Sequence, residues 1–221
     1  MKTLIHFPFC PYCRKTRLQL AEKKILFNLE TELYWKKREE FLDINPAGQV
    51  PVFIDEKIVI PDSNAISEYL EEVYLEFPLL PLKPIDRAEV RRLVAYVEGI
   101  FAREVTRNIF YEKTMKRVQG QGGPDSQNLR EGQKALTEHL DYFSYLIENR
   151  TYLALEQLTI ADLALAAHLS CIDFLGHVPW DSYPQVKDWY LCLKSRPSFK
   201  PLLEDVMPGV TPSETYAALD F

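Results

Sequence analysis

The sequence predicts an α/β unit followed by an all-helical unit. Three observations lead to this prediction. Short strand-like and helical segments alternate at the start of the chain, prolines interrupt it at Pro78, Pro81 and Pro84, and almost every later segment has a helical pattern. Prolines this close together allow neither a helix nor a central strand to continue, which indicates a stiff linker. We expect four parts: an N-terminal domain at 1–77, a linker at 78–85, a helical domain at 86–207 and a tail at 208–221.

The N-terminal part has the element order of a small thioredoxin-like sheet with helices on its faces. Two helical patterns, at 13–24 and 63–75, are separated by strand-like runs. The last two runs flank Asp55 and Glu56, whose length and composition are typical of a hairpin connection. The strand-like runs occupy residues 3–7, 27–34, 51–54 and 57–60.

The motif Cys10-Pro11-Tyr12-Cys13 stands between the first strand-like run and the first helical pattern. Two such pairs would suggest a zinc site, whereas a single pair in this place is typical of a thioredoxin-type redox motif. Cys10 would lie at the helix N-terminus, where free N–H groups and the helix dipole favour a thiolate. Cys13 lies three residues on, within reach to resolve a mixed disulfide. We predict Cys10 and Cys13 as the catalytic pair; the alternative is an inherited thiol on a protein that only binds.

The second half is predicted to be helical. A long helix is expected from Asp86, where Asp86 and Glu89 form a variant of the capping box, to about residue 118. A further helix follows at about 126–149, and another at about 184–195. Thr159 and Asp162 form a capping box at the start of the most apolar helix, which we expect to be central and buried. The stretch from 208 to 221 contains Pro, Gly, Ser and Thr and is expected to be irregular.

Composition excludes several classes of protein. The 221 residues are 47% hydrophobic and 26% charged, and the net charge is −6 with a pI near 5.4. No basic surplus is available to neutralise phosphates, which argues against nucleic-acid binding. No apolar stretch is long enough for a membrane span, and the start lacks the pattern of a signal peptide. The four cysteines form no disulfide framework, and His, Cys, Asp and Glu show no metal-ligand spacing. We therefore expect a protein of the reducing cytoplasm, without a metal and without membrane insertion.

The local motifs resemble those of cytosolic glutathione transferases. A thioredoxin-like half, a proline linker and an all-helical half form the layout of that family. The segment Asn45–Val52 is similar to the family's N-P-x-G-x-V-P motif, and Asp62-Ser63 resembles its acidic-Ser pair. Leu158–Asp162 resembles its capping motif in the second domain. With the cysteine motif, these matches span both halves in the family's order and imply a thioredoxin-like domain followed by the family's all-helical C-terminal domain.

The resemblance implies a glutathione site and a homodimer. Asp62 would pair with the α-ammonium group of glutathione, and Ser63 with the free N–H groups of its helix would hold the γ-glutamyl carboxylate. Ser63 is also well suited simply to cap that helix. The backbone of Val50, before a cis Pro51, would bind the cysteinyl amide. Gln49 would lie near the glycyl carboxylate and offers a hydrogen bond without charge.

Several longer segments are similar to a bacterial subgroup of this family that includes an FtsZ-localised cell-division protein. In that subgroup the resemblance implies FtsZ-filament binding through Trp35 and the tail residues Leu219, Asp220 and Phe221. Trp35 could instead wall the glutathione pocket or pack at the domain edge. The segments are Tyr34-Trp35, Gly122–Asp125, Ala166–Gly176, Val178–Trp180, Lys194–Phe199 and Tyr216–Phe221.

The tail allows two interpretations. Disordered ends are commonly polar, whereas Tyr216, Leu219 and Phe221 are apolar. Either folding back into a groove or capture by a partner would explain them. Two functions therefore stay open: a glutathione-dependent thiol transferase or reductase that uses Cys10, and a non-catalytic dimeric scaffold that binds FtsZ filaments.

Overall fold

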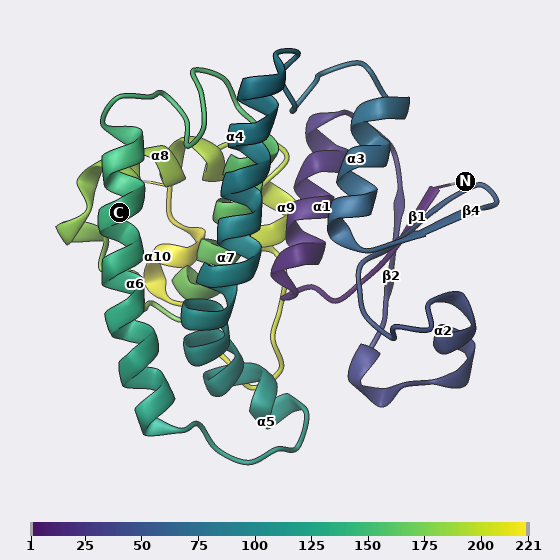
Figure 1. Cartoon of the computed structure of the whole chain (residues 1–221). Coiled ribbons are helices and arrows are strands. Elements are labelled where there is room, and N and C mark those ends of the chain that lie inside the picture. Colours follow the sequence, from purple (N-terminus) through teal and green to yellow (C-terminus); the bar gives the residue numbers. More distant parts are fainter. Residues whose placement is uncertain (1, 220–221) are drawn as a thin grey trace.

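The N-terminal half is built on a four-stranded sheet (Figure 1). The computed structural model describes residues 2–219. The strand order is β2-β1-β3-β4, with β1 parallel to β2 and antiparallel to β3, so that Leu4 faces Phe53 across the β1–β3 pair. The predicted small sheet is thus confirmed. The strands are β1 (Lys2–His6), β2 (Asn28–Thr31), β3 (Val52–Asp55) and β4 (Ile58–Pro61).

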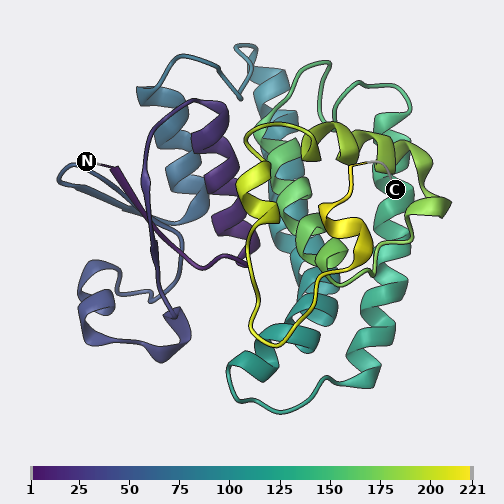
Figure 2. The same cartoon turned by 180° about the vertical axis from the view of Figure 1, so that it is seen from behind.

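Helices α1 (Pro11–Glu22) and α3 (Ser63–Val73) lie between the sheet and the helical half (Figures 1 and 2). Their apolar side chains form a small core with the sheet, because β1 and β3 alternate buried residues toward them. Two short helices, η1 (Tyr34–Lys36) and α2 (Glu39–Ile44), lie in the connection from β2 to β3. The small core consists of Leu4, Leu20, Phe53, Ile66 and Leu70, each fully buried.

The second half consists of helices packed around α7 (Ile160–Phe174), all of whose residues are buried. This confirms the prediction that the most apolar helix is central. Asp162 accepts the backbone N–H of Thr159 at 2.9 Å, as the predicted capping box requires. The remaining helices are α4 (Pro84–Ala95), η2 (Tyr96–Met115), α5 (Lys116–Val118), α6 (Ser126–Ile147), η3 (Trp180–Ser182), α8 (Pro184–Lys194), α9 (Lys200–Leu203) and α10 (Glu214–Ala217).

Several predicted element ends are wrong; for example, the first helix begins at Pro11 rather than residue 13, and β2 ends at Thr31 rather than residue 34. The long helix opens at Pro84 rather than Asp86, because proline is well suited to the first helical position and needs no side-chain cap. The β-hairpin connection is Glu56-Lys57 rather than Asp55-Glu56. Asp55 still pairs with Ile58 in the ladder, and Glu56 takes the turn with a left-handed φ of 57°. From Pro84 the helix runs on through η2, whose hydrogen bonding is of the wider π type, into α5.

The tail is more ordered than its composition predicts. A short helix, α10, places Tyr216 in the core, where 1% of its surface is exposed. The Tyr216 hydroxyl donates to the Leu202 carbonyl at 2.8 Å and accepts from the Arg14 guanidinium at 3.0 Å. Of the two interpretations of the apolar tail residues, folding back into the molecule is therefore the one observed for Tyr216. Within residues 2–219, no helix has both the length and the apolar character to cross a membrane.

Buried charges join the two halves. Arg14 on α1 is fully buried and donates to Ser170 on α7 at 2.7 Å and to Asp205 at 3.1 Å. Lys15, also fully buried, forms an ion pair of 2.7 Å with Glu98 on η2. Since α1 carries the cysteine motif at its start, these contacts fix the motif relative to the helical half.

Candidate functional site

Two hollows adjoin where the halves meet. The first, the apolar cavity, has a volume of about 380 Å³, and the second, the polar pocket, about 430 Å³. They share Tyr12, Gln49 and Val50. The apolar cavity is also lined by Phe7, Phe9, Cys10, Pro11, Tyr34, Ala102, Thr106, Arg107, Phe110, Tyr111, Met115 and His168. The polar pocket is also lined by Asn45, Ala47, Pro51, Pro61, Asp62, Ser63, Asn64 and Glu98.

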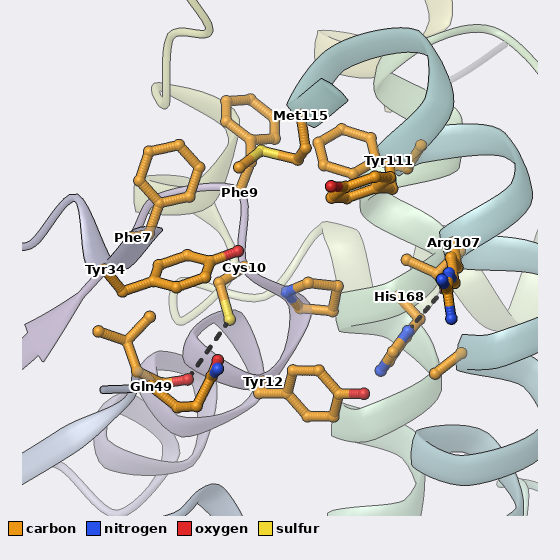
Figure 3. Close-up of a pocket in the computed structure, with 15 residues that line it drawn as sticks. Phe7, Phe9, Cys10, Tyr12, Tyr34, Gln49, Arg107, Tyr111, Met115 and His168 are labelled. Carbon is orange, nitrogen blue, oxygen red and sulfur yellow. Dashed lines mark hydrogen bonds between the residues drawn. The ribbon is translucent and has the colours of Figure 1, made fainter. Parts of the chain in front are cut away.

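Cys10 lines the apolar cavity (Figure 3) and lies next to Val50, which lines both hollows. It caps α1 in an extended conformation, and Pro11 takes the first helical position, as the sequence predicts. Its thiol lies 3.8 Å from the carbonyl of Val50. Burial acts to raise the pKa of Cys10, but hydrogen bonds from the Cys13 thiol and from the N–H groups of Cys13 and Tyr12 together hold it below the ordinary value. The helix start thus favours a thiolate that faces open space.

Cys13 is in a different environment. Its side chain is fully buried. Burial raises the pKa of Cys13 well above its ordinary value, and its hydrogen bond to Cys10 and the nearby charge of that thiolate act in the same direction. Cys13 is therefore a thiol that donates a hydrogen bond, while Cys10 is the member of the pair that ionises.

The segment before β3 borders both hollows. The Val50–Pro51 peptide bond is cis, as the family resemblance implies. Gln49 is exposed and lines both hollows, so its amide is free to contact a ligand that extends from one to the other. Asn45 donates to the Gln49 carbonyl at 2.8 Å, which fixes the turn that leads into this segment.

At the start of α3, the cap is Asp62 rather than Ser63. Asp62 accepts the N–H groups of Asn64 and Ala65 at 2.8 and 3.0 Å and has a left-handed φ of 76°. Ser63 is the first helical residue, and among residues 2–219 its hydroxyl has no hydrogen-bond partner. An aspartate is an equally good cap, which leaves this hydroxyl free to bind a ligand in the polar pocket.

Glu98 enters the polar pocket from the helical half, and sequence patterns alone gave no sign of it. Its carboxylate is buried and pairs with Lys15, which also donates to Asn64 at 2.9 Å. The Tyr12 hydroxyl donates to the backbone carbonyl of Glu98 at 3.2 Å. The partners lie more than eighty positions apart in the chain, so only the fold brings them together.

The helical wall of the apolar cavity was also missed. Figure 3 shows Arg107, Tyr111 and His168 across the cavity from Tyr34 and Cys10. A signal existed, because Ala102, Thr106 and Phe110 recur every fourth residue and therefore share one helix face. Nothing in that spacing indicates that this face borders a hollow rather than the core.

Of the predicted partner-binding residues, Trp35 and Leu219 line neither hollow. Trp35 is half-buried, and its ring packs edge-on against Phe7 at 5.1 Å between ring centroids. Leu219 is 51% exposed. Asp220 and Phe221 lie outside the described residues. One alternative for Trp35 was a place in the wall of the glutathione pocket. The structure does not show this, because Trp35 lines neither hollow.

Among the described residues, no group of three His, Cys, Asp or Glu side chains is arranged to hold a metal ion. All four cysteines are free thiols, and Cys192 is exposed. The apolar helical patterns around Cys171 and Cys192 predict small core residues; Cys171 is buried, as this predicts, whereas Cys192 is exposed and the prediction is wrong for it. Cys192 lies on α8, in which Trp189 and Tyr190 are buried.

The match with known protein families agrees with this architecture. The family model of the glutathione S-transferase N-terminal domain matches residues 9–73, and that of the C-terminal domain matches residues 110–197. FtsZ-localized protein A of Caulobacter vibrioides is 43% identical over 100% of this chain and 98% of its own. The chain belongs to the glutathione S-transferase family.

Solved structures of family members are similar over the whole chain. A glutathione S-transferase from Rhodospirillum rubrum superposes with a TM-score of 0.98 at 47% identity, covering 100% of both chains. FzlA from C. crescentus superposes with a TM-score of 0.97 at 43% identity, covering 100% of this chain and 99% of the other. Glutathione S-transferase DHAR3 of Arabidopsis thaliana is 32% identical over 92% of this chain and 73% of its own.

Proteins of this family use glutathione as a cosubstrate, and the polar pocket suits that tripeptide. Its γ-glutamyl end carries an ammonium and a carboxylate group. The polar pocket contains the carboxylates of Asp62 and Glu98, a type of group that pairs with an ammonium, and the Ser63 hydroxyl at the start of α3, a type of donor that binds a carboxylate. Gln49 lies where the two hollows meet and offers an uncharged amide.

Proposed function

We propose that this protein is a glutathione-dependent thiol transferase with Cys10 as its nucleophile. One observation carries the proposal: a cysteine with a lowered pKa lies at a helix start in the wall of the apolar cavity, beside Val50, which also lines the polar pocket. A serine or tyrosine here would instead stabilise the thiolate of glutathione for conjugation. A cysteine favours thiol exchange because it forms the covalent intermediate itself.

The proposed reaction has two exchange steps. The Cys10 thiolate attacks the glutathionyl sulfur of a mixed disulfide; the substrate S–S bond breaks, a Cys10–glutathione disulfide forms, and the substrate leaves as a thiolate with the electron pair. A second glutathione thiolate then attacks the glutathionyl sulfur on Cys10. This step releases oxidised glutathione and restores the Cys10 thiolate, so no other oxidant or reductant is needed.

Cys13 is proposed to assist rather than to resolve the adduct. Its burial and raised pKa disfavour the thiolate that attack would require. Its hydrogen bond instead stabilises the Cys10 thiolate, which is the better leaving group in the second step.

The proposal is tested by turnover of the glutathione–cysteine mixed disulfide. The measured quantity is the release of oxidised glutathione. Cys10→Ala should reduce turnover to the uncatalysed rate. Cys13→Ala should keep measurable turnover, because a second glutathione resolves the adduct. Cys192→Ala removes an exposed thiol far from the site and is the matched control. Turnover by Cys10→Ala equal to that of the unaltered protein would refute the assignment.

We propose association with FtsZ as a second function, supported by the 43% identity over the whole chain to FtsZ-localized protein A. The candidates for this contact are Trp35 and Leu219 from the described part of the chain, and Asp220 and Phe221 from outside it. In this proposal the protein is a homodimer of the bacterial cytoplasm. Co-sedimentation with assembled FtsZ tests it: truncation of Leu219–Phe221 should abolish pelleting, and unchanged pelleting would contradict the tail's role. Cys10→Ala separates the two functions, since it should leave pelleting unchanged.

A further inference from the structure

Among residues 2–219, the apolar cavity combines an aromatic wall with a single cation. Large apolar or aromatic side chains dominate its lining, and no Asp, Glu or Lys side chain of this described part contributes to it. A ligand that fills this cavity gains by burying apolar surface, at about 25 cal/mol per Å². The wall consists of Phe7, Phe9, Tyr34, Phe110, Tyr111 and Met115.

Arg107 is the cation. It is exposed, and within residues 2–219 its guanidinium takes part in no ion pair or hydrogen bond. The other cations of η2 have polar partners among the described residues: Arg103 pairs with Glu104 at 3.0 Å, and Lys113 is hydrogen-bonded to His177. An arginine without a carboxylate partner at the wall of an apolar cavity is suited to bind an anion, since its planar fork matches a carboxylate.

His168 adds a second polar atom to the same wall. Its ring is 1% exposed, Nδ1 is 2.8 Å from the Thr106 hydroxyl, and Nε2 has no partner among the described residues. Burial lowers the pKa of His168 to about 3, and the Lys15 charge acts in the same direction, so the ring is neutral at pH 7. A buried polar atom without a partner favours a ligand that supplies one.

We propose that the apolar cavity selects mixed disulfides whose leaving thiol is aromatic and carries a carboxylate group. Arg107 binds that carboxylate. This inference rests on the proposed thiol exchange. The glutathionyl part of the mixed disulfide then occupies the polar pocket, and its aromatic part occupies the cavity. Because Cys10 lines the cavity beside Val50, which lines both hollows, the S–S bond lies where the two hollows adjoin, next to the nucleophile. The aromatic thiolate leaves with the electron pair of the broken bond.

Paired probes test the selectivity. We would compare glutathione mixed disulfides of 4-mercaptobenzoate and of its uncharged amide, 4-mercaptobenzamide. The expected preference in kcat/KM for the carboxylate is about tenfold, the effect of one charge-assisted hydrogen-bonded contact at a partly exposed site. Arg107→Leu should reduce the ratio of the two values to about one. Arg103→Leu, on the same helix but outside the cavity, should keep it.

A binding measurement separates this inference from the exchange reaction. Calorimetry with 4-(methylthio)benzoate and its amide needs no turnover, and Arg107→Leu should remove the same preference there. Binding preference without turnover would support the cavity's selectivity and refute the thiol transferase. Turnover of both probes with a ratio near one would support the transferase and overturn this inference, as would a ratio unaffected by Arg107→Leu.

Discussion

At Cys10, burial and hydrogen bonding oppose each other. Burial disfavours the thiolate, whereas hydrogen bonds from the Cys13 thiol and from the first backbone N–H groups of α1 favour it, and the pKa is lowered. The Cys13 donor is a side chain, so it can be removed without altering the backbone of the helix start. The sequence alone predicted the helix-terminus contribution but placed Cys13 in a resolving role, because spacing does not reveal burial.

Removing the Cys13 donor should raise the pKa of Cys10. A hydrogen bond to a charged group contributes about 1.5–3 kcal/mol, so Cys13→Ala should raise this pKa by about one to two units. The rate of alkylation by iodoacetamide would then reach its plateau at higher pH, with a slower rate at pH 7. The pH profile should be measured in a Cys192→Ala background, because Cys192 is exposed. An unchanged profile would contradict the role of Cys13.

At the scale of elements, α7 is held by an aspartate inside the core. Asp162 is fully buried; burial acts to raise its pKa, and its hydrogen bonds offset part of that effect. It accepts from the backbone N–H of Leu153 at 2.7 Å, from the indole of Trp189 at 3.1 Å and from Thr159. The predicted capping box therefore also ties α7 to the preceding loop and to α8.

Asp162→Ala should destabilise the protein strongly. It leaves the Leu153 N–H, the Thr159 N–H and the Trp189 indole without their acceptor inside the core. Each unsatisfied buried group costs about 1–3 kcal/mol, so a loss of about 3 kcal/mol or more in the free energy of unfolding is expected. Urea denaturation measures it. Asp125→Ala, an exposed cap of α6, is the control and should cost about 1 kcal/mol. Equal losses would contradict the core role of Asp162.

The tail helix α10 supplies a second test at this scale. Tyr216→Ala should lower stability by about 3–5 kcal/mol because it removes a buried aromatic ring. Leu219→Ala, only three residues away but half exposed, should change it by no more than about 0.5 kcal/mol. Thermal unfolding of both variants tests whether Tyr216 is packed in the core. If the apolar residues of the tail contacted only a partner protein, neither variant would change the Tm.

Local patterns predicted the elements, while contacts between distant segments supplied much of the site. The alternation of strands and helices, the Thr159–Asp162 box and the position of Cys10 follow from neighbouring residues and were predictable. Glu98 and Arg107 reach the hollows only because α1 packs on the helical half. Their sequence surroundings are those of an ordinary helix, so no local pattern identifies them.

At the scale of the whole molecule, the two halves share buried charges. Lys15 on α1 and Glu98 on η2 have side chains 0% and 6% exposed, whereas the Glu68–Arg91 pair, which also joins the halves, is largely exposed. Buried pairs are costly to break because the remaining charge has no water around it. The two ion pairs should therefore contribute very differently to stability.

Glu98→Gln should cost about 3 kcal/mol, because it leaves the Lys15 charge buried and unpaired. In a chain of this size, each kcal/mol lowers the Tm by about 2–4 °C. Glu68→Gln is the matched control and should cost less than about 1 kcal/mol. Calorimetric scans of both variants measure the difference. A similar small change in both would show that the buried pair does not stabilise the contact between the halves.

The central claim is that Cys10 is a glutathione-reactive nucleophile in a site that holds the tripeptide. Intact-mass spectrometry of the protein after incubation with oxidised glutathione tests it most directly. Cys192→Ala should gain one glutathionyl group, and the Cys10→Ala Cys192→Ala double variant should gain none. If the Cys192→Ala protein gains neither an adduct on Cys10 nor a Cys10–Cys13 disulfide, Cys10 is not the nucleophile proposed here.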